Sequence, residues 1–363
     1  MLADSLETRS RDLLSRAEIE IGGSREWDVT VHNPALYARV LRQGSLGLGE
    51  SYMEGWWDCP RLDQFFHRVF LAGLDRMVAS GWRGLALALA SSLWNRQTLA
   101  RSPEVARRHY DVGNELFAAM LDRRMVYTTG WWDHAANLDE AQEAKLDFIC
   151  RRLGLEPGMR VLDIGCGWGS FAKFAAERYG ARVDGITLSH EQLALGQRLC
   201  AGLPVDLRLE DYRAVAQRYD RIVSLGMFEH VGYRNYRQYF ATARRCLASA
   251  GAMFLSSIGS NRSVHATDPW MERYIFPNSH LPSIQQIGQA IEDRFIPLEW
   301  LNWAADYDRT LMAWFANFES GWERWQQRYG ARFCRMWKFY LLASAAGFRA
   351  RRLQVWQMLL APL

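Results

Sequence analysis

The sequence predicts an α/β protein, in which a doubly wound, Rossmann-like domain follows a smaller N-terminal α+β domain. Three observations lead to this prediction. From about residue 108, apolar runs of strand length alternate with segments of helical periodicity, which is the pattern of parallel strands joined by crossover helices. The first such run, 160–164, leads through a glycine-rich loop into a helix. The length of 363 residues allows about two domains at roughly 150 residues each.

The N-terminal domain is predicted over residues 1–100 and the sheet domain over 101–363, with the boundary within 95–108. The first twenty residues have the leucine spacing of an amphipathic helix. Residues 29–59 are rich in glycine and aromatic side chains and are expected to form short strands and turns, with an aromatic turn at Trp56–Trp57.

The sheet domain is predicted element by element from its apolar periodicity. Strands are expected at 160–164, 182–187, 205–210, 221–226 and 252–258. Helices are expected at 170–179, from Ser189 with Gln192 completing a capping box, at 235–247 and at 308–325. The segment 353–360 is expected to return as an edge strand.

The composition excludes several classes of protein. A net charge of +4, with 49% hydrophobic and 23% charged residues, argues against a disordered chain and against a dedicated nucleic-acid binder. The six cysteines form no CxxC and the histidines show no ligand spacing, so no metal site is predicted. The N-terminus lacks the pattern of a signal peptide, and no apolar run approaches the roughly 20 residues of a membrane span. We therefore expect a cytoplasmic protein. Of the 44 basic residues only three are lysines, which codon bias explains most simply: Lys145, Lys173 and Lys338.

Residues 61–108 differ in charge from the rest of the chain. They carry eight arginines against three acidic residues and enclose the apolar run 84–94, flanked by Trp82 and Trp94. Tryptophan and arginine beside a short apolar face are typical of a helix that lies in a membrane interface. An ordinary packed helix with a solvated basic side is the alternative.

A glycine-rich loop follows the strand at 160–164 and contains Gly165, Gly167 and Gly169. Glycine permits positive φ and lets a ligand touch the backbone, and nucleotides bind at the carboxyl ends of such strands. The GxGxG spacing differs from the GxGxxG of dinucleotide sites, and Asp163 offers a fixed anion for a ligand's ammonium group. These features favour S-adenosylmethionine over NAD.

Seven further segments carry a family resemblance, and they follow one another in family order along most of the chain. They are "YMEGWWDC" (52–59), "HYDVGNELF" (109–117), "VLDIGCGWG" (161–169), "DRIVSLGMFEHVG" (220–232), "DPWMERYIFPN" (268–278), "ADYDRTLMAW" (305–314) and "FRARRLQVWQ" (348–357). In these segments the chain resembles the cyclopropane-fatty-acyl-phospholipid synthases, S-adenosylmethionine methyltransferases that act on cis double bonds of lipid acyl chains. The resemblance implies a class I methyltransferase domain, with the N-terminal domain that the shorter mycolic-acid relatives lack.

The resemblance implies a set of cofactor-binding positions in this chain. Tyr127 and Thr128 would close over the methionine part of the cofactor, and Asp211 and Tyr212 would hold the adenine. The other implied positions lie in the glycine loop and after the second strand: Gly165, Gly167, Thr187, Leu188 and Gln192.

The resemblance also implies a bicarbonate ion that acts as the base. Glu229, Ile258 and Tyr307 match three of its ligand positions, but Thr129 stands where the family has Cys and Ser256 where it has His. Hydroxyls donate hydrogen bonds but lack the charge of a protonated histidine, and charge-assisted bonds are roughly twice as strong. Two hypotheses stay open: the pocket holds bicarbonate more weakly, or Glu229 is itself the base.

The implied reaction accounts for these residue types. Methyl transfer to an alkene leaves a carbocation, which aromatic faces stabilise and which water would trap. A base then removes a proton from the new methyl group, so that the ring closes. The alternatives are a methylated or methylene acyl chain, an amine N-methyltransferase, and a lipid-binding protein without activity.

The implied partners are an unsaturated phospholipid and the membrane surface, with the enzyme bound peripherally at the inner face of the membrane. A homodimer is expected by analogy with the family, and no nucleic acid is expected.

Overall fold

A computed structural model describes residues 2–79, 113–264 and 267–363, and these form two compact units. Unit 1 contains the described residues within 1–94, 266–276 and 311–352; unit 2 contains those within 95–265, 277–310 and 353–363. The predicted domain boundary at 95–108 and the Trp-flanked apolar run 84–94 lie outside the described residues.

The sheet of unit 2 has seven strands among the described residues, in the order β5-β4-β3-β6-β7-β9-β8. The first five in this order pair in parallel, whereas β9 runs antiparallel between β7 and β8. The strands are β3 (Arg160–Ile164), β4 (Arg182–Thr187), β5 (Val205–Leu209), β6 (Tyr219–Leu225), β7 (Leu247–Ser260), β8 (Phe295–Asn302) and β9 (Leu353–Pro362). All five strands expected before residue 300 are present.

The prediction of an edge strand at 353–360 is wrong in one respect. β9 is an interior strand, because its second side pairs with β8, which the periodicity did not predict. β8 itself forms the edge, and its mostly exposed side chains explain why it lacks an apolar pattern.

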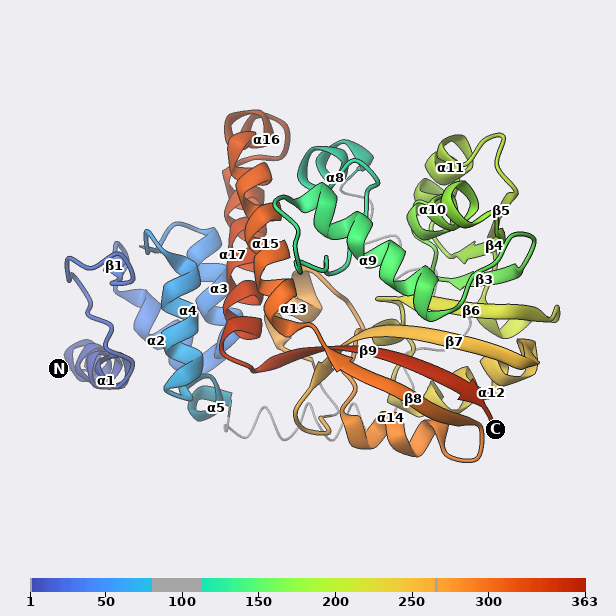
Figure 1. Ribbon diagram of the computed structural model, residues 1–363. Helices are drawn as coiled ribbons and strands as arrows, with labels where there is room; N and C mark the ends of the chain where they lie inside the picture. Colours follow the sequence, from blue (N-terminus) through green and yellow to red (C-terminus); the bar gives the residue numbers. More distant parts are fainter. Residues whose placement is uncertain (1, 80–112, 265–266) are drawn as a thin grey trace. The chain divides into compact units, whose positions relative to one another are not determined.

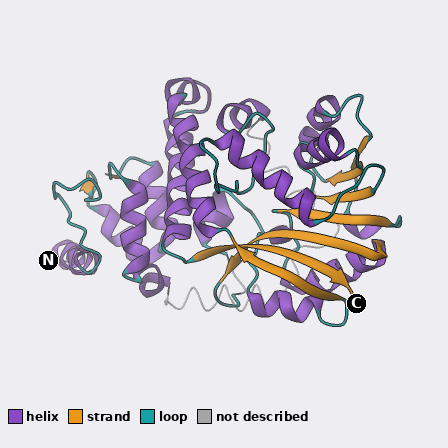
Figure 2. Ribbon diagram, viewed as in Figure 1, coloured by secondary structure: helices purple, strands orange, loops and turns teal. Residues whose placement is uncertain are grey.

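Helices cover both faces of this sheet (Figures 1 and 2). On one face lie α9 (Leu138–Arg152), α10 (Ser170–Tyr179) and α11 (His190–Leu199); on the other lie α12 (Tyr236–Cys246) and α14 (Ile284–Ile291). Shorter helices of unit 2 are α8 (Asn114–Met120), η1 (Tyr212–Ala214), η2 (Phe228–His230) and η3 (Tyr233–Asn235). This arrangement confirms the doubly wound α/β prediction.

The start of α11 shows half of the predicted capping box. Ser189 Oγ accepts a hydrogen bond from the Gln192 backbone N–H at 3.3 Å. The Gln192 side chain does not return to the N-cap, because the Thr187 hydroxyl donates to its Oε1 at 3.0 Å.

Unit 1 is almost wholly helical. Its helices are α1 (Leu2–Ser15), α2 (Ala35–Gln43), α3 (Ser45–Met53), α4 (Leu62–Leu71), α5 (Leu74–Ala79), α13 (Pro269–Tyr274), α16 (Trp322–Tyr329) and α17 (Ala331–Arg349), with the later part of α15 (Ala304–Ser320). Its strands β1 (Thr30–Val31) and β2 (Trp57–Asp58) form a two-residue antiparallel pair.

The prediction of strands and turns over 29–59 is therefore wrong for most of that segment. Glycine is a turn signal, but here it permits close packing in α3. A Cβ at Gly49 would lie 2.3 Å from the Trp270 ring, and one at Gly47 would lie 2.6 Å from the Arg39 carbonyl oxygen. The helix expected at 308–325 likewise divides, because Gly321 separates α15 from α16.

The core of unit 1 combines aromatic rings with a buried ion pair. Asp63 is buried and accepts hydrogen bonds from Arg61 and, at 2.8 Å, from Arg349 of α17.

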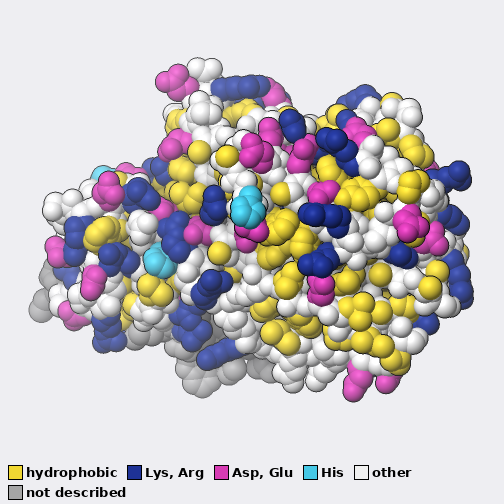
Figure 3. Space-filling model, in the orientation of Figure 1, with side chains coloured by type: hydrophobic (Ala, Val, Ile, Leu, Met, Phe, Trp, Pro, Cys, Tyr) yellow, Lys and Arg dark blue, Asp and Glu magenta, His cyan; other side chains and the backbone are white. Residues whose placement is uncertain are grey.

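On the face shown in Figure 3, basic and acidic side chains are interspersed with apolar ones. None of the described helices is long and apolar enough to cross a membrane.

Candidate active site

The glycine loop joins β3 to α10. The N–H groups of Gly165 and Cys166 donate to the Ile186 carbonyl at 2.9 and 3.0 Å, which fixes the loop against the end of β4. Gly165, Gly167 and Gly169 all have positive φ. A Cβ at Gly167 would meet no atom within 4 Å, so this residue presents bare backbone to open space. Such a surface is suited to a ligand that approaches the chain closely.

Asp163, in β3 just before this loop, is a buried carboxylate with unmet hydrogen-bonding capacity. It is 2% exposed, and its Oδ2 has no hydrogen-bond partner among the described residues. Burial raises the pKa of Asp163 to about 7. A buried acceptor without a partner is unfavourable until a donor reaches it, and a ligand ammonium group would be such a donor. Asp163 and Gly167 therefore fit S-adenosylmethionine.

The segment that carries Tyr127 and Thr128 lies beside the glycine loop. The Tyr127 ring packs against Phe117 at 5.1 Å, and Phe117 packs against Trp168 of the loop at 5.2 Å. A Cβ at Gly226, just after β6, would lie 2.7 Å from the Thr128 methyl group. The structure thus brings this segment together with the carboxyl ends of β3 and β6.

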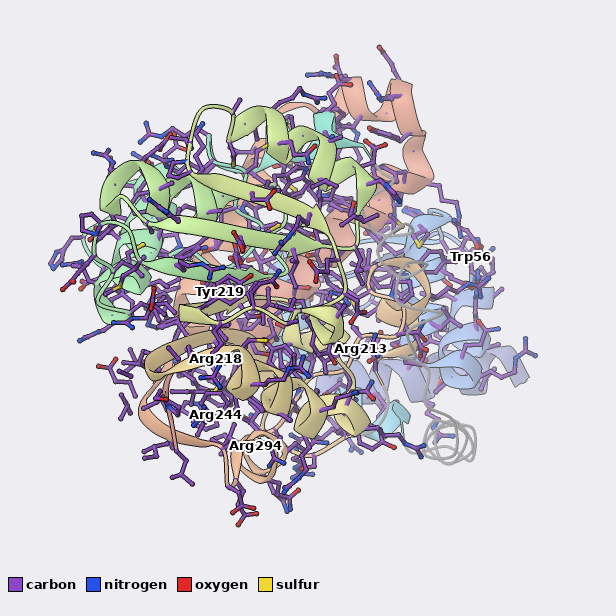
Figure 4. The ribbon with its side chains drawn as sticks, turned by 90° about the vertical axis from the view of Figure 1, so that its right-hand side faces the viewer. Trp56, Arg213, Arg218, Tyr219, Arg244 and Arg294 are labelled. Carbon is purple, nitrogen blue, oxygen red and sulfur yellow. The ribbon has the colours of Figure 1, made fainter. Side chains whose placement is uncertain are left out.

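The other predicted cofactor positions occupy the neighbouring strand ends. Thr187, the last residue of β4, and Gln192 are buried, and their side chains are hydrogen-bonded to each other. Leu188, which follows Thr187 in the sequence, is half-buried. Asp211 and Tyr212 follow β5, but their side chains also serve local structure. Asp211 forms an ion pair with Arg213 at 2.7 Å (Arg213 is labelled in Figure 4), and the Tyr212 ring packs on Tyr239.

Glu229 lies in η2, just beyond the end of β6. It is 4% exposed, and its Oε1 accepts a hydrogen bond from the Ile258 N–H at 2.6 Å. Its Oε2 has no hydrogen-bond partner among the described residues. Burial raises the pKa of Glu229 to about 7, although hydrogen bonds from the Ile258 backbone and the Ser257 hydroxyl oppose the shift. This carboxyl group can therefore exchange a proton near neutral pH.

Thr129, Ser256 and Tyr307 are also buried. Ser256 and Ile258 lie two residues apart on β7, so their side chains point to the same face of the sheet. The Thr129 hydroxyl donates to the Gly130 carbonyl at 2.9 Å, and the Gly130 N–H donates to Thr310 on α15, the helix that also carries Tyr307.

These residues do not fit a bicarbonate ion held as the resemblance implies. The Ile258 N–H is taken by Glu229, and the Thr129 hydroxyl is taken by Gly130. Among the described residues no cation contributes to the pKa of Glu229, and burial lowers the pKa of the adjacent His230 to about 4, so that imidazole is neutral. An anion added here would have no positively charged partner within the part of the chain that the structure describes.

Lys145 is a site residue that the sequence did not single out as functional. It lies on α9, is 1% exposed, and its Nζ donates to the Thr128 hydroxyl at 2.8 Å. Gln142, one turn earlier, donates to the Thr128 carbonyl at 2.8 Å. The scarcity of lysine was the one available signal. The described residues contain no cluster of side chains suited to a metal ion.

Comparison with known proteins agrees with this geometry. The sequence profile of the family described as mycolic acid cyclopropane synthetase matches residues 97–358. The cyclopropane-fatty-acyl-phospholipid synthase of Escherichia coli K12 is 48% identical over 349 residues, which are 96% of this chain and 91% of that protein. The tuberculostearic acid methyltransferase UfaA1 of Mycobacterium tuberculosis is 34% identical over 90% of this chain and 81% of its own length.

A solved structure gives the same result. The mycolic acid cyclopropane synthase CmaA1, in complex with SAH and CTAB, superposes with a TM-score of 0.67 at 29% identity, over 71% of this chain and 97% of that one. The family resemblance and the class I methyltransferase fold expected from the sequence are thus confirmed. The chain belongs to the cyclopropane synthase family of S-adenosylmethionine-dependent methyltransferases.

Proposed function

We propose that this protein is a cyclopropane-fatty-acyl-phospholipid synthase, which adds a methylene group from S-adenosylmethionine across the cis double bond of an unsaturated phospholipid acyl chain. The observation that carries the proposal is the 48% identity to the E. coli enzyme over 96% of this chain, which includes the N-terminal part. This level of sequence identity argues against an amine N-methyltransferase. The open glycine loop and the two buried carboxylates argue against a binding protein without activity.

The cofactor end of the site orients the methyl donor. When bound, S-adenosylmethionine supplies a methyl group on a sulfonium, which is electrophilic enough for an alkene. Asp163 would accept hydrogen bonds from its ammonium group, since the Oδ2 atom has no partner within the described parts of the chain. Gly167 would let the cofactor approach the backbone, and Tyr127 with Thr128 would cover the methionine portion.

The base end of the site completes the ring. The lipid cation that follows methyl transfer must lose a proton from the new methyl group. We assign Glu229 as the proton acceptor, because it is buried and its pKa is raised to about 7. One of its carboxylate oxygens also lacks a hydrogen-bond partner among the residues that the structure describes. The hydroxyls of Ser256 and Tyr307 are too weak as nucleophiles to trap the lipid cation before it loses its proton.

Mass spectrometry of phospholipids tests the product. Cells that lack a cyclopropane synthase would express this chain, and their acyl methyl esters would be compared before and after hydrogenation. The expected acyl chain is heavier by one CH2 and resists hydrogenation as a cyclopropane does. A methyl-branched or methylene product would instead support the alternative that UfaA1 exemplifies by name. Unchanged lipids from a folded enzyme that is supplied with cofactor would contradict both.

Membrane binding is a further part of this proposal, because phospholipid substrates reside in bilayers. The sequence of residues 61–108, with its excess of arginine and its Trp-flanked apolar run, supports a peripheral site for the anionic inner face of the membrane. Vesicle sedimentation should show preference for anionic lipid and weakening by salt, since exposed charges are screened beyond about 8 Å at physiological ionic strength. Equal binding to neutral and anionic vesicles at all salt concentrations would oppose it. The homodimer remains a prediction by analogy.

A further inference from the structure

Lys145 is a buried cation that the proposed chemistry does not use. Its side chain is enclosed within the fold, and the described residues give it one hydrogen-bond acceptor, the Thr128 hydroxyl at 2.8 Å. A buried ammonium group is costly unless it is paired and hydrogen-bonded. A leucine or methionine on the same face of α9 would fill such a position without that cost, so the charge needs a reason.

The opposite charge that acts on Lys145 belongs to Asp122, which is also buried. The carboxylate of Asp122 accepts hydrogen bonds from the N–H groups of Arg124 and Val126, at 2.9 and 2.8 Å. Burial lowers the pKa of Lys145, and Asp122 opposes that effect. The Asp122 side chain thus holds the start of the segment 122–128 through backbone hydrogen bonds, and Lys145 holds its end.

Residue 128 is held at two points by the same helix. Gln142 binds its carbonyl and Lys145 binds its hydroxyl, each at 2.8 Å. On its other side the Thr128 methyl group faces Gly226, where no Cβ fits. Thr128 is thus fixed in position and in rotamer, and the adjacent Tyr127 is held against Phe117 beside the glycine loop.

We propose that Lys145 is a positioning residue for S-adenosylmethionine binding, which acts by fixing Thr128 and, through it, the segment that covers the methionine part of the cofactor. The inference rests on the proposed function and on the assignment of Tyr127 and Thr128 to the cofactor site. Pre-organisation of a segment raises affinity because less ordering remains to be done on binding.

Calorimetric titration with S-adenosylmethionine, without lipid, tests this role. Lys145→Met keeps the length of the side chain and removes its donor, so the Kd should rise roughly tenfold, the low end for loss of a bond from a charged group. Leu146→Ala is the matched control, since Leu146 is the fully buried neighbour on α9. It should lower the melting temperature while the cofactor Kd stays within about twofold, because its effect is on packing. In lipid assays Lys145→Met should raise the KM for S-adenosylmethionine more than it lowers kcat.

Two further variants keep the test decisive. Asp122→Asn combined with Lys145→Met removes both charges, so that no unpaired carboxylate destabilises the fold. Thr128→Val removes the acceptor, and its effect on the Kd should not multiply with that of Lys145→Met if the two residues act through one bond.

The proposal is overturned if folded Lys145→Met, or the variant without both charges, binds the cofactor as Leu146→Ala does. It is equally overturned if the Thr128→Val and Lys145→Met effects multiply. A wild-type protein that binds S-adenosylmethionine but leaves lipids unchanged would refute the proposed function and leave this inference standing. A folded wild-type protein that does not bind it would refute both.

Discussion

The cofactor end and the base end of this site differ in how closely they follow the family. At the cofactor end the structure holds the expected residues in place through backbone hydrogen bonds and buried contacts, as at Gly165 and Thr128. At the base end two of the five expected residues differ, at Thr129 and Ser256, and one Glu229 oxygen lacks a partner in residues 2–79, 113–264 and 267–363. We expect cofactor binding to depend on the shape of the backbone at the glycine loop as well as on the Asp163 charge, and such a shape tolerates little change. A proton acceptor needs a suitable pKa, and burial alone can set that pKa without the family's other residues.

The largest expected effect separates the two ends directly. Glu229→Gln should lower cyclopropane formation by at least about a hundredfold, since a positioned general base contributes roughly 10²–10⁴ in rate. Cofactor affinity should stay within about twofold, because Glu229 acts after the cofactor is bound. Gas chromatography of acyl methyl esters and calorimetry would measure the two quantities.

Glu292→Gln is the matched control for that variant, because Glu292 is an exposed carboxylate after α14. It should leave both quantities unchanged. A Glu229→Gln enzyme with full cyclopropanation would place the base elsewhere.

Gly167→Ala tests the cofactor end. This substitution should lower the affinity for S-adenosylmethionine roughly ten- to a hundredfold. The added methyl group would meet no protein atom, so any loss of binding reports the ligand. Gly202→Ala is the control, since it has the same open surroundings and a positive φ of 81°. Both variants should lose about 1–2 kcal/mol of stability from the left-handed backbone. Equal cofactor affinity in the two variants would refute the glycine cradle.

The protonation of Asp163 should make cofactor affinity depend on pH. Its pKa is raised to about 7, and only the carboxylate form pairs with an ammonium group. Affinity should therefore rise roughly tenfold per pH unit up to about pH 7 and fall again above about pH 8, where the α-amino group of the ligand loses its proton. Calorimetry from pH 5 to 8.5 would measure the curve, and Asp163→Asn should flatten it.

The same raised pKa has a consequence for the cofactor-free protein. Between the ordinary pKa of 3.8 and about 7, the folded state keeps a proton that the unfolded chain has lost. Stability should therefore fall as the pH rises through this window, and thermal unfolding of Asp163→Asn should lack that component.

The smallest expected effect concerns bicarbonate. If Glu229 is the base, removal of bicarbonate from the buffer should change wild-type turnover by less than about twofold. Ser256→His restores the residue type that the family has, and it should create a response to added bicarbonate, because a charge-assisted bond contributes about 1.5–3 kcal/mol. Strong dependence of the wild type on bicarbonate would favour the other hypothesis and would reduce the contrast between the two ends.

The sequence by itself determined most of the sheet domain and the cofactor end. β4 and α10 begin and end at the predicted residues, and the glycine loop lies between β3 and α10 as expected. These features follow from local periodicity and from the backbone freedom of glycine, which depend on residues close together along the chain. The family resemblance added the predictions for the distant site positions.

The tertiary structure alone decided the rest. The glycines of α3 were mistaken for turn residues, because only the fold shows that Trp270 packs against Gly49. The interior position of β9 depends on β8, whose exposed side chains carry no pattern. The hydrogen bond from Lys145 to Thr128 joins residues 17 positions apart, and the raised pKa of Glu229 reflects its burial in the fold. Hydrogen bonds and desolvation depend on which atoms are in contact. Those contacts are set by the packing of segments that are distant in the sequence, which local sequence does not specify.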